Sequence, residues 1–219
     1  MIFIEDDKPS FTVSASTIYP YQLNYLQLTE LDCKINYKDI VYHLKTQTTG
    51  DEIYKEIIVQ FSTEKKINNK LRLGLILSNY HIHINNYGNS NCSTIGLTIK
   101  TKIAENLKTR ILIPNLTALI TAKLFEEIPK TLTVSLIKEL PKNQRINYII
   151  EKDVLFDLDH QIFWTIDLLS FIGVRVGYKS LTNETVWNLN LKYNKYHIKF
   201  GIILHSVLGT STGFGISYE

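Results

Sequence analysis

Few residues of this sequence have the type and spacing that chemistry requires. His81 and His83 are separated by one residue, so a strand would carry both imidazoles on one face, as a metal pair would require. A zinc site takes at least three protein ligands, and no third candidate can be identified. We therefore interpret these histidines as polar lumen or loop-base residues and predict no metal site.

Two other motifs also fail as catalytic or cofactor sites. The run Gly209 to Gly213 (Gly-Thr-Ser-Thr-Gly) has the glycines of a phosphate loop but lacks its lysine and the helix that follows. Serine, histidine and aspartate all occur, but without a nucleophile elbow or the order of a known triad. The sequence predicts no catalytic residue and no cofactor, so we expect a protein that is not an enzyme.

Composition excludes several classes of protein. The chain has 219 residues, of which 44% are hydrophobic, with 24 Lys and Arg against 21 Asp and Glu, a net charge of +3. That balance excludes bulk disorder, and the absence of a basic stripe argues against a nucleic-acid partner. Two cysteines cannot make a disulfide scaffold, and no apolar run is long enough for a membrane helix. A soluble all-β domain and a membrane β-barrel remain.

Alternation of apolar and polar residues dominates the chain. From Thr185 to Tyr193 and from Tyr196 to Leu204, every second residue belongs to an apolar face. The same test predicts about 14 strands, at residues 10–18, 26–37, 40–48, 54–65, 70–83, 93–103, 106–114, 130–140, 144–153, 160–169, 171–180, 185–193, 195–204 and 211–218. Only 116–125 has apolar residues at helical spacing.

The connections and the apolar faces favour a membrane barrel. Short turns alternate with longer links in this division of the chain, as in an outer-membrane barrel with short periplasmic turns. The alternating leucines from Leu71 to Leu77 and the apolar face from Ile162 to Leu168 are tall enough to cross the lipid. We predict an all-β, antiparallel up-and-down transmembrane β-barrel in the cell outer membrane. Residues 1–9 would form an N-terminal extension and residues 10–219 a single barrel domain.

The opposite faces of these strands predict the lining of the barrel. The residues expected to point inward are Arg72, Asp167, Arg175, Lys192, Lys195, His197 and Lys199. Because a barrel of this size encloses room for solvent, we expect an N-terminal segment or the loop Asn115–Pro129 to plug it. Trp164 and Trp187 fall in the apolar bands instead, where lipid or a core would cover them.

The last fifty residues resemble the C-terminus of the PorV/PorQ-like family of outer-membrane barrels. The likeness rests on Phe171–Tyr178, on the run from His205 to Thr212, and on the final Phe214–Tyr218. Tyr54-Lys55-Glu56 and Asn115-Leu116-Thr117 also have counterparts, although Ser206 and Thr212 replace the family's proline and second histidine. His205, Leu208 and Gly209 are the family-motif residues, of unknown role.

The resemblance implies a fold like that of the FadL fatty-acid channel and no enzymatic activity. It also implies an accessory subunit of an outer-membrane secretion or assembly complex, such as the type IX secretion apparatus. Its partners would then be outer-membrane lipid and other outer-membrane subunits. The alternatives are a FadL-like barrel that transports hydrophobic molecules, and a soluble all-β ligand-binding module.

The start of the chain does not resemble a secretory signal. Four apolar residues from Met1 to Ile4 are followed at once by acidic ones, whereas a signal needs a basic start and a longer apolar run. Either the protein stays inside the cell or this chain lacks its true N-terminus.

Overall fold

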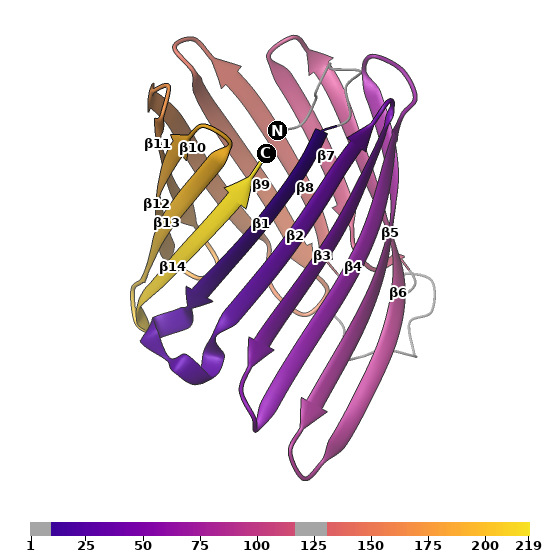
Figure 1. Cartoon of the computed structure of the whole chain (residues 1–219), viewed down its shortest axis with the longest axis vertical. Helices are drawn as coiled ribbons and strands as arrows, with labels where there is room; N and C mark the ends of the chain where they lie inside the picture. Colours follow the sequence, from indigo (N-terminus) through magenta and orange to yellow (C-terminus); the bar gives the residue numbers. More distant parts are fainter. Residues whose placement is uncertain (1–9, 117–130) are drawn as a thin grey trace.

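The chain closes into a barrel of antiparallel strands, as the computed structural model of residues 10–116 and 131–219 shows (Figure 1). Each strand pairs with its neighbours in sequence, and β1 pairs with β14 to close the sheet. No sheet edge is left along that seam, where seven residue pairs from Val13↔Tyr218 to Tyr19↔Thr212 are in register. Closure removes edge strands. In water an open edge can pair with another chain and aggregate, and in lipid its backbone N–H and C=O groups would lack hydrogen-bond partners.

Fourteen strands and two short 3-10 helices make up the described residues. The strands are β1 Ser10–Tyr19, β2 Leu28–Tyr37, β3 Ile40–Gly50, β4 Tyr54–Lys66, β5 Leu71–Ile84, β6 Gly88–Ala104, β7 Leu107–Ile113, β8 Thr131–Leu140, β9 Gln144–Asp153, β10 Asp159–Leu169, β11 Ile172–Lys179, β12 Glu184–Tyr193, β13 Tyr196–His205 and β14 Gly209–Tyr218. The helices η1 Pro20–Gln22 and η2 Asn24–Leu26 lie between β1 and β2.

These strands confirm the predicted fold class and the predicted strand count. The largest difference is at β6, which begins at Gly88 instead of residue 93, because β5 and β6 stay paired down to Ile84↔Gly88. The two short helices were not predicted. The predicted helix at 116–125 and the plug at Asn115–Pro129 lie almost entirely outside the described residues, as does the predicted extension at 1–9.

The two ends of the barrel differ in their connections. We name as the turn end the one joined by residues 38–39, 67–70, 105–106, 141–143, 170–171 and 194–195, where β14 also finishes. The opposite end, the loop end, carries residues 20–27, 51–53, 85–87, 114–130, 154–158, 180–183 and 206–208. The longest connections all fall at the loop end, as predicted. Several loop-end connections are as short as the turns, however, because β3, β6 and β14 extend further than predicted.

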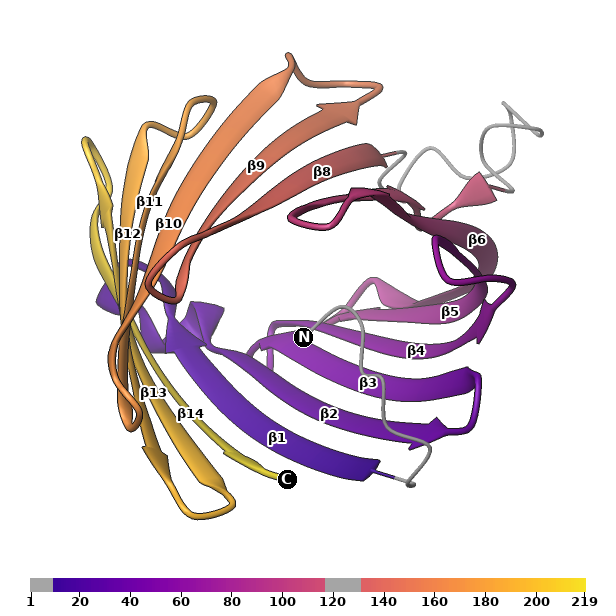
Figure 2. The same ribbon diagram turned by 90° about the horizontal axis from the view of Figure 1, so that it is seen from above.

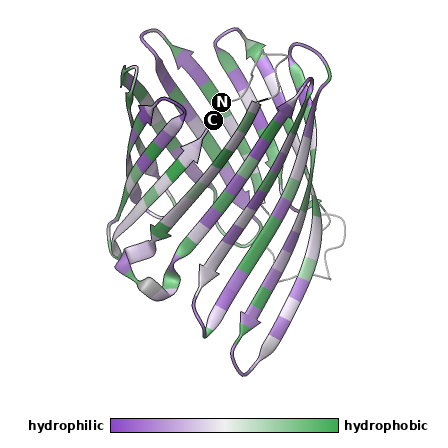
Figure 3. Ribbon diagram, viewed as in Figure 1, coloured by the Kyte–Doolittle hydropathy of each residue, from purple (hydrophilic) through white to green (hydrophobic). Residues whose placement is uncertain are grey.

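The two faces of the sheet meet different surroundings. Large apolar side chains point outward and stay exposed, for example Leu75 at 56% and Trp187 at 51%. Among the described residues the buried hydrophobic side chains are only Ile76, Ile137, Phe163 and Val186, and all four lie on inward-facing positions. A soluble sandwich would bury its apolar face between sheets. Here that face forms the outside of the barrel, where lipid would cover it. Figure 3 shows the alternation of hydrophobic and hydrophilic residues along the strands.

Tyrosines lie near both borders of this apolar exterior. Tyr37, Tyr193, Tyr196 and Tyr218 lie at the turn end, and Tyr19 and Tyr178 lie at the loop end. Such positions suit the aromatic girdles of membrane barrels. Tyr80 of β5 instead points inward, in register with Ile58 and Cys92. No helix among the described residues is long and apolar enough to cross a membrane.

Candidate functional site

The interior of the barrel is the candidate site, because its wall gathers most of the charged side chains of the strands. Figure 2 looks along the barrel from above and shows the sheet wrapping around this interior. Register assigns the inward face: Asn36, Val41, Glu64, Gly74 and Thr98 follow one another around five strands. The inward side chains are therefore mainly polar, small or charged.

Ion pairs crosslink the wall from β2 to β6. His43 Nε2 lies 2.6 Å from Asp32 Oδ2, and Lys45 Nζ lies 2.7 Å from Glu30 Oε2. Lys100 Nζ donates to Glu64 Oε2 at 2.6 Å, and both of these side chains are almost fully shielded from solvent. Similar pairs join Lys108 to Glu139 at 2.5 Å and Lys179 to Glu184 at 2.7 Å. Paired charges of this kind satisfy polar groups on a wall that faces away from bulk water.

One aromatic ring packs against the wall from β9 to β12. Phe163 of β10 is buried and lies beside Gly177 of β11, where an added Cβ would meet the ring at 2.1 Å. The Arg175 guanidinium carbon lies 3.9 Å from the centroid of the same ring, a cation-π contact. The glycine thus makes room for the ring, and the ring fixes the arginine.

The wall from β13 through β14 to β1 is lined by small residues. Gly201, Gly213 and Gly215 face inward together with Ser16. A cavity of about 160 Å³ lies against this wall, lined by these four residues and by Ile18, Asn188, Lys199 and Ile203, with Thr212 and Phe214 of β14. In the described interior, ion pairs therefore line one side, and glycines, which have no side chain, leave more space along the other.

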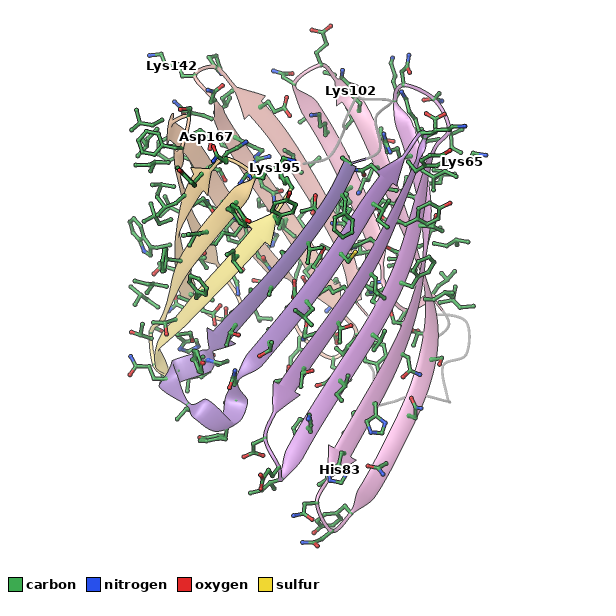
Figure 4. All side chains as sticks on the ribbon, in the orientation of Figure 1. Lys65, His83, Lys102, Lys142, Asp167 and Lys195 are labelled. Atoms are coloured by element: carbon green, nitrogen blue, oxygen red, sulfur yellow. The ribbon has the colours of Figure 1, made fainter. Side chains whose placement is uncertain are left out.

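Charge is distributed unevenly along the barrel axis. The inward cations near the turn end include Lys34, Arg72, Lys100, Lys102, Lys108, Arg145 and Lys192, and they outnumber the inward acids there, Glu64, Glu139 and Asp167. The inward acids near the loop end are Glu56, Glu151, Asp153, Asp159 and Glu184. Figure 4 labels Lys102 and Lys142 at the turn end and His83 at the loop end. The interior is therefore polarised, basic toward the turns and acidic toward the loops.

The structure confirms most of the predicted lining and corrects two of its assignments. Arg72, Asp167, Arg175, Lys192, His197 and Lys199 all lie on inward-facing positions. Lys195 does not, because it occupies the turn 194–195 and its Nζ lies 5.8 Å from the centroid of the Tyr218 ring.

The two histidines of the first motif do not line the lumen. His81 and His83 share the outward face of β5 with Leu71 to Leu77, at the loop end, where His83 Nδ1 is 2.6 Å from Asn89 Oδ1. They are loop-base residues, and the lumen interpretation was wrong. The described residues contain no group of three or more potential metal ligands.

The three family-motif residues build the hairpin between β13 and β14. His205 Nδ1 accepts hydrogen bonds from the backbone N–H groups of Val207 and Leu208, both at 3.0 Å. Gly209 follows with φ of +94°, a conformation that suits glycine. The Tyr21 ring meets the His205 ring edge-on at 5.8 Å. The motif thus stabilises the β13–β14 hairpin, and its functional role stays a prediction.

Sequence reasoning missed the hydrogen bonds that join neighbouring loops. Asp159 Oδ1 accepts from Leu181 N at 2.8 Å and from Ser180 Oγ at 3.2 Å. Asn183 Nδ2 donates to Ser206 Oγ at 3.0 Å. These contacts join three successive hairpin loops into one rim, and no motif signals them, because each partner is more than 20 residues away.

Comparison with known proteins shows the fold and no family. No protein-family model matches the chain, and no curated protein matches it by sequence. Among solved structures, the outer membrane protein Omp33 of Acinetobacter baumannii is 7% identical, with a TM-score of 0.63 over 95% of this chain and 97% of that one. The P. putida toluene transporter TodX is 8% identical, with a TM-score of 0.64 over 97% and 90%. The KdgM porin is 13% identical, with a TM-score of 0.51 over 95% and 98%.

The fold and the exterior together define the class of protein. The closed fourteen-stranded sheet has the architecture of outer-membrane porins and channels, and its apolar exterior suits lipid. The chain is an outer-membrane β-barrel with a channel-like fold.

Proposed function

We propose that this barrel passes small hydrophilic solutes across the outer membrane through a narrow polar passage, without catalysis. The observation that carries the proposal is the mainly charged and polar inward wall of the closed barrel, beside which the Gly201, Gly213 and Gly215 wall leaves a local cavity of about 160 Å³. The inward side chains of Arg145, Lys192 and Lys199 are exposed, so water reaches them inside the barrel.

The polarity of the wall favours hydrophilic solutes over hydrophobic ones. A channel for hydrocarbons needs apolar groups in succession along its path, since each buried charge would have to be desolvated by the solute. The four buried hydrophobic residues of the described interior are separated by charged and polar neighbours, such as Asn147 and Arg175 around Phe163. This argues against the FadL-like transport alternative.

A second candidate is the accessory-subunit role implied by the PorV/PorQ-like resemblance. The observation that favours it is the apolar character of the loop end. Val207 is 83% exposed, Leu155 78% and Phe156 62%, and they lie on the loops that hydrogen bonds join into one rim. Exposed apolar patches of this kind mark surfaces that contact other molecules.

Single-channel recording in planar bilayers tests the passage. The intact chain should give small, steady currents, weaker than those of larger porins, because ion pairs occupy much of the interior. Currents that appear only after deletion of 116–125 would support the predicted loop plug. Absence of current from both forms would contradict the passage and leave the accessory role.

A matched pair of substitutions locates the path. Gly215→Leu adds an inward side chain at the cavity, where an added Cβ would lie 3.1 Å from Ser16 Cβ, and should reduce conductance. Ile216→Leu, one residue away on the outward face, should leave it unchanged. Equal conductance of the two variants would place the path elsewhere.

Site-specific photocrosslinking in native membranes tests the accessory role. A crosslinker at Phe156 should capture one defined outer-membrane protein, whereas one at Tyr87, another exposed loop-end residue, should not. Equal labelling at the two positions would indicate non-specific contact.

A further inference from the structure

Four inward acids on β2, β4 and β8 already lie within ion-pair distance of a basic side chain. Glu64 is bound by Lys100, Glu139 by Lys108, Asp32 by His43 and Glu30 by Lys45. The three glutamates each have a lysine Nζ within 2.7 Å, which offsets their charge, and Asp32 has the His43 ring at 2.6 Å. They therefore contribute little net field to the interior.

Several inward cations lack such a partner among the described residues, and four of them, Arg145, Arg175, Lys192 and Lys199, lie on β9 to β13. Among the described residues, no carboxylate lies within ion-pair distance of Arg145, Arg175, Lys192 or Lys199. Asp167 is the nearby acid without an ion pair, and it lines a cavity of about 360 Å³ that Lys192 and His197 also line. The net charge of this part of the interior is positive.

These cations stand beside the passage. Arg145, Thr165, Arg175, Asn188 and Gly201 follow one another in register from β9 to β13. Asn188, Gly201 and Lys199 line the cavity itself, and Arg175 is fixed by its contact with Phe163. A positive, water-filled lining between low-dielectric walls concentrates anions and repels cations.

The acids of the loop end do not oppose this lining equally. Asp159 accepts hydrogen bonds from Leu181, Ser180 and Gln161, and Glu184 is paired with Lys179. Glu56, Glu151 and Asp153 remain without an ion pair in the described part of the chain, but they lie near the loop end, whereas Arg145 and Lys192 lie near the turn end.

We infer that the passage selects small anions, such as inorganic anions and short carboxylates. The inference rests on the proposed passage and adds the class of solute. No bond is made or broken, and the selectivity arises from the field of Arg145, Arg175, Lys192 and Lys199.

Reversal potentials in a KCl gradient test the inference. The wild-type chain should show chloride preference, stronger at 0.1 M than at 1 M salt because screening weakens the field of exposed charges. The Arg145→Glu, Lys199→Glu double variant should shift the reversal potential toward potassium. Lys65→Glu, an outward residue near the turn end, should retain the wild-type value.

The outcomes separate the two proposals. Clear currents without anion preference, or an equal shift in the Lys65→Glu control, would overturn the selectivity and leave the passage in place. A complete absence of current, also after deletion of 116–125, would overturn the passage and the selectivity together.

Discussion

At the scale of the residue, a shift of one position along a strand moves a side chain from the lipid-facing side of the barrel to the lumen. Leu189 and Asn190 are adjacent in the middle of β12, yet the first points outward and the second inward, in register with Gly173 and Lys199. A strand turns each successive side chain to the opposite face, so neighbours experience different solvents.

Charge substitution at these two positions should therefore have unequal effects. Leu189→Arg is expected to lower the free energy of unfolding by about 2–4 kcal/mol, because the charge enters lipid near the middle of the membrane. Asn190→Arg should cost much less, since the interior is polar. Reversible unfolding in lipid vesicles measures both, and equal losses would contradict the assigned faces.

The contact between Gly177 and Phe163 gives a second prediction at this scale. Gly177→Ala should destabilise the barrel by about 1–3 kcal/mol, because the added Cβ would meet the ring at 2.1 Å and force it to move.

A double-mutant cycle provides the control. In a Phe163→Ala background the same alanine should cost much less, since the ring is gone. Additive costs would show that the strain arises from the backbone and not from the ring.

At the scale of the element, the hairpin ends depend on residues that tolerate left-handed backbone angles. Lys38 and Asn194 have φ of 51° and 53° in two of the two-residue turns of the turn end, and Asn86 and Asn183 have φ of 67° and 51° at the loop end. Asparagine adopts such angles more readily than other non-glycine residues, which favours tight hairpins.

The His205 cap gives a prediction for the β13–β14 hairpin. His205→Leu removes the acceptor of two backbone N–H groups and should cost about 1–2 kcal/mol. His205→Asn should retain most of the stability, because an asparagine oxygen accepts similar turn hydrogen bonds. Faster hydrogen exchange at Val207 and Leu208 in the leucine variant alone would support the cap; identical exchange in both variants would refute it.

At the scale of the whole molecule, closure turns an apolar sheet face into an exterior. The exposed apolar side chains on the outward faces of strands all around the barrel have no partner layer among the described residues, and lipid would supply one.

This exterior predicts how the protein partitions. The folded chain should fractionate with outer membranes and need detergent for extraction, because water would otherwise meet the apolar band directly. Sucrose-gradient fractionation followed by size-exclusion chromatography measures this. Recovery as a monodisperse soluble monomer without detergent would contradict the membrane assignment.

The sequence by itself determined the strands and most of their facing. A period of two is a local property, so the alternation from Thr185 to Tyr193 was sufficient to assign β12 and its lipid face. The pattern was ambiguous where the band ends. Beyond Ser78 the apolar residues of β5 change face, so alternation left open whether His81 and His83 were lumen or loop-base residues, and the structure places them at the loop base.

Only the tertiary structure decided which inward residues meet. The pairing of Glu64 with Lys100 joins residues 36 positions apart, and the β1–β14 seam joins the two ends of the described chain. The narrow cavity exists because closure brings Ser16 of β1 beside Gly215 of β14. Alternation in the sequence indicates which face of each strand is apolar, but register and closure are properties of the complete sheet. They determine which charges cancel and which remain to act on a solute.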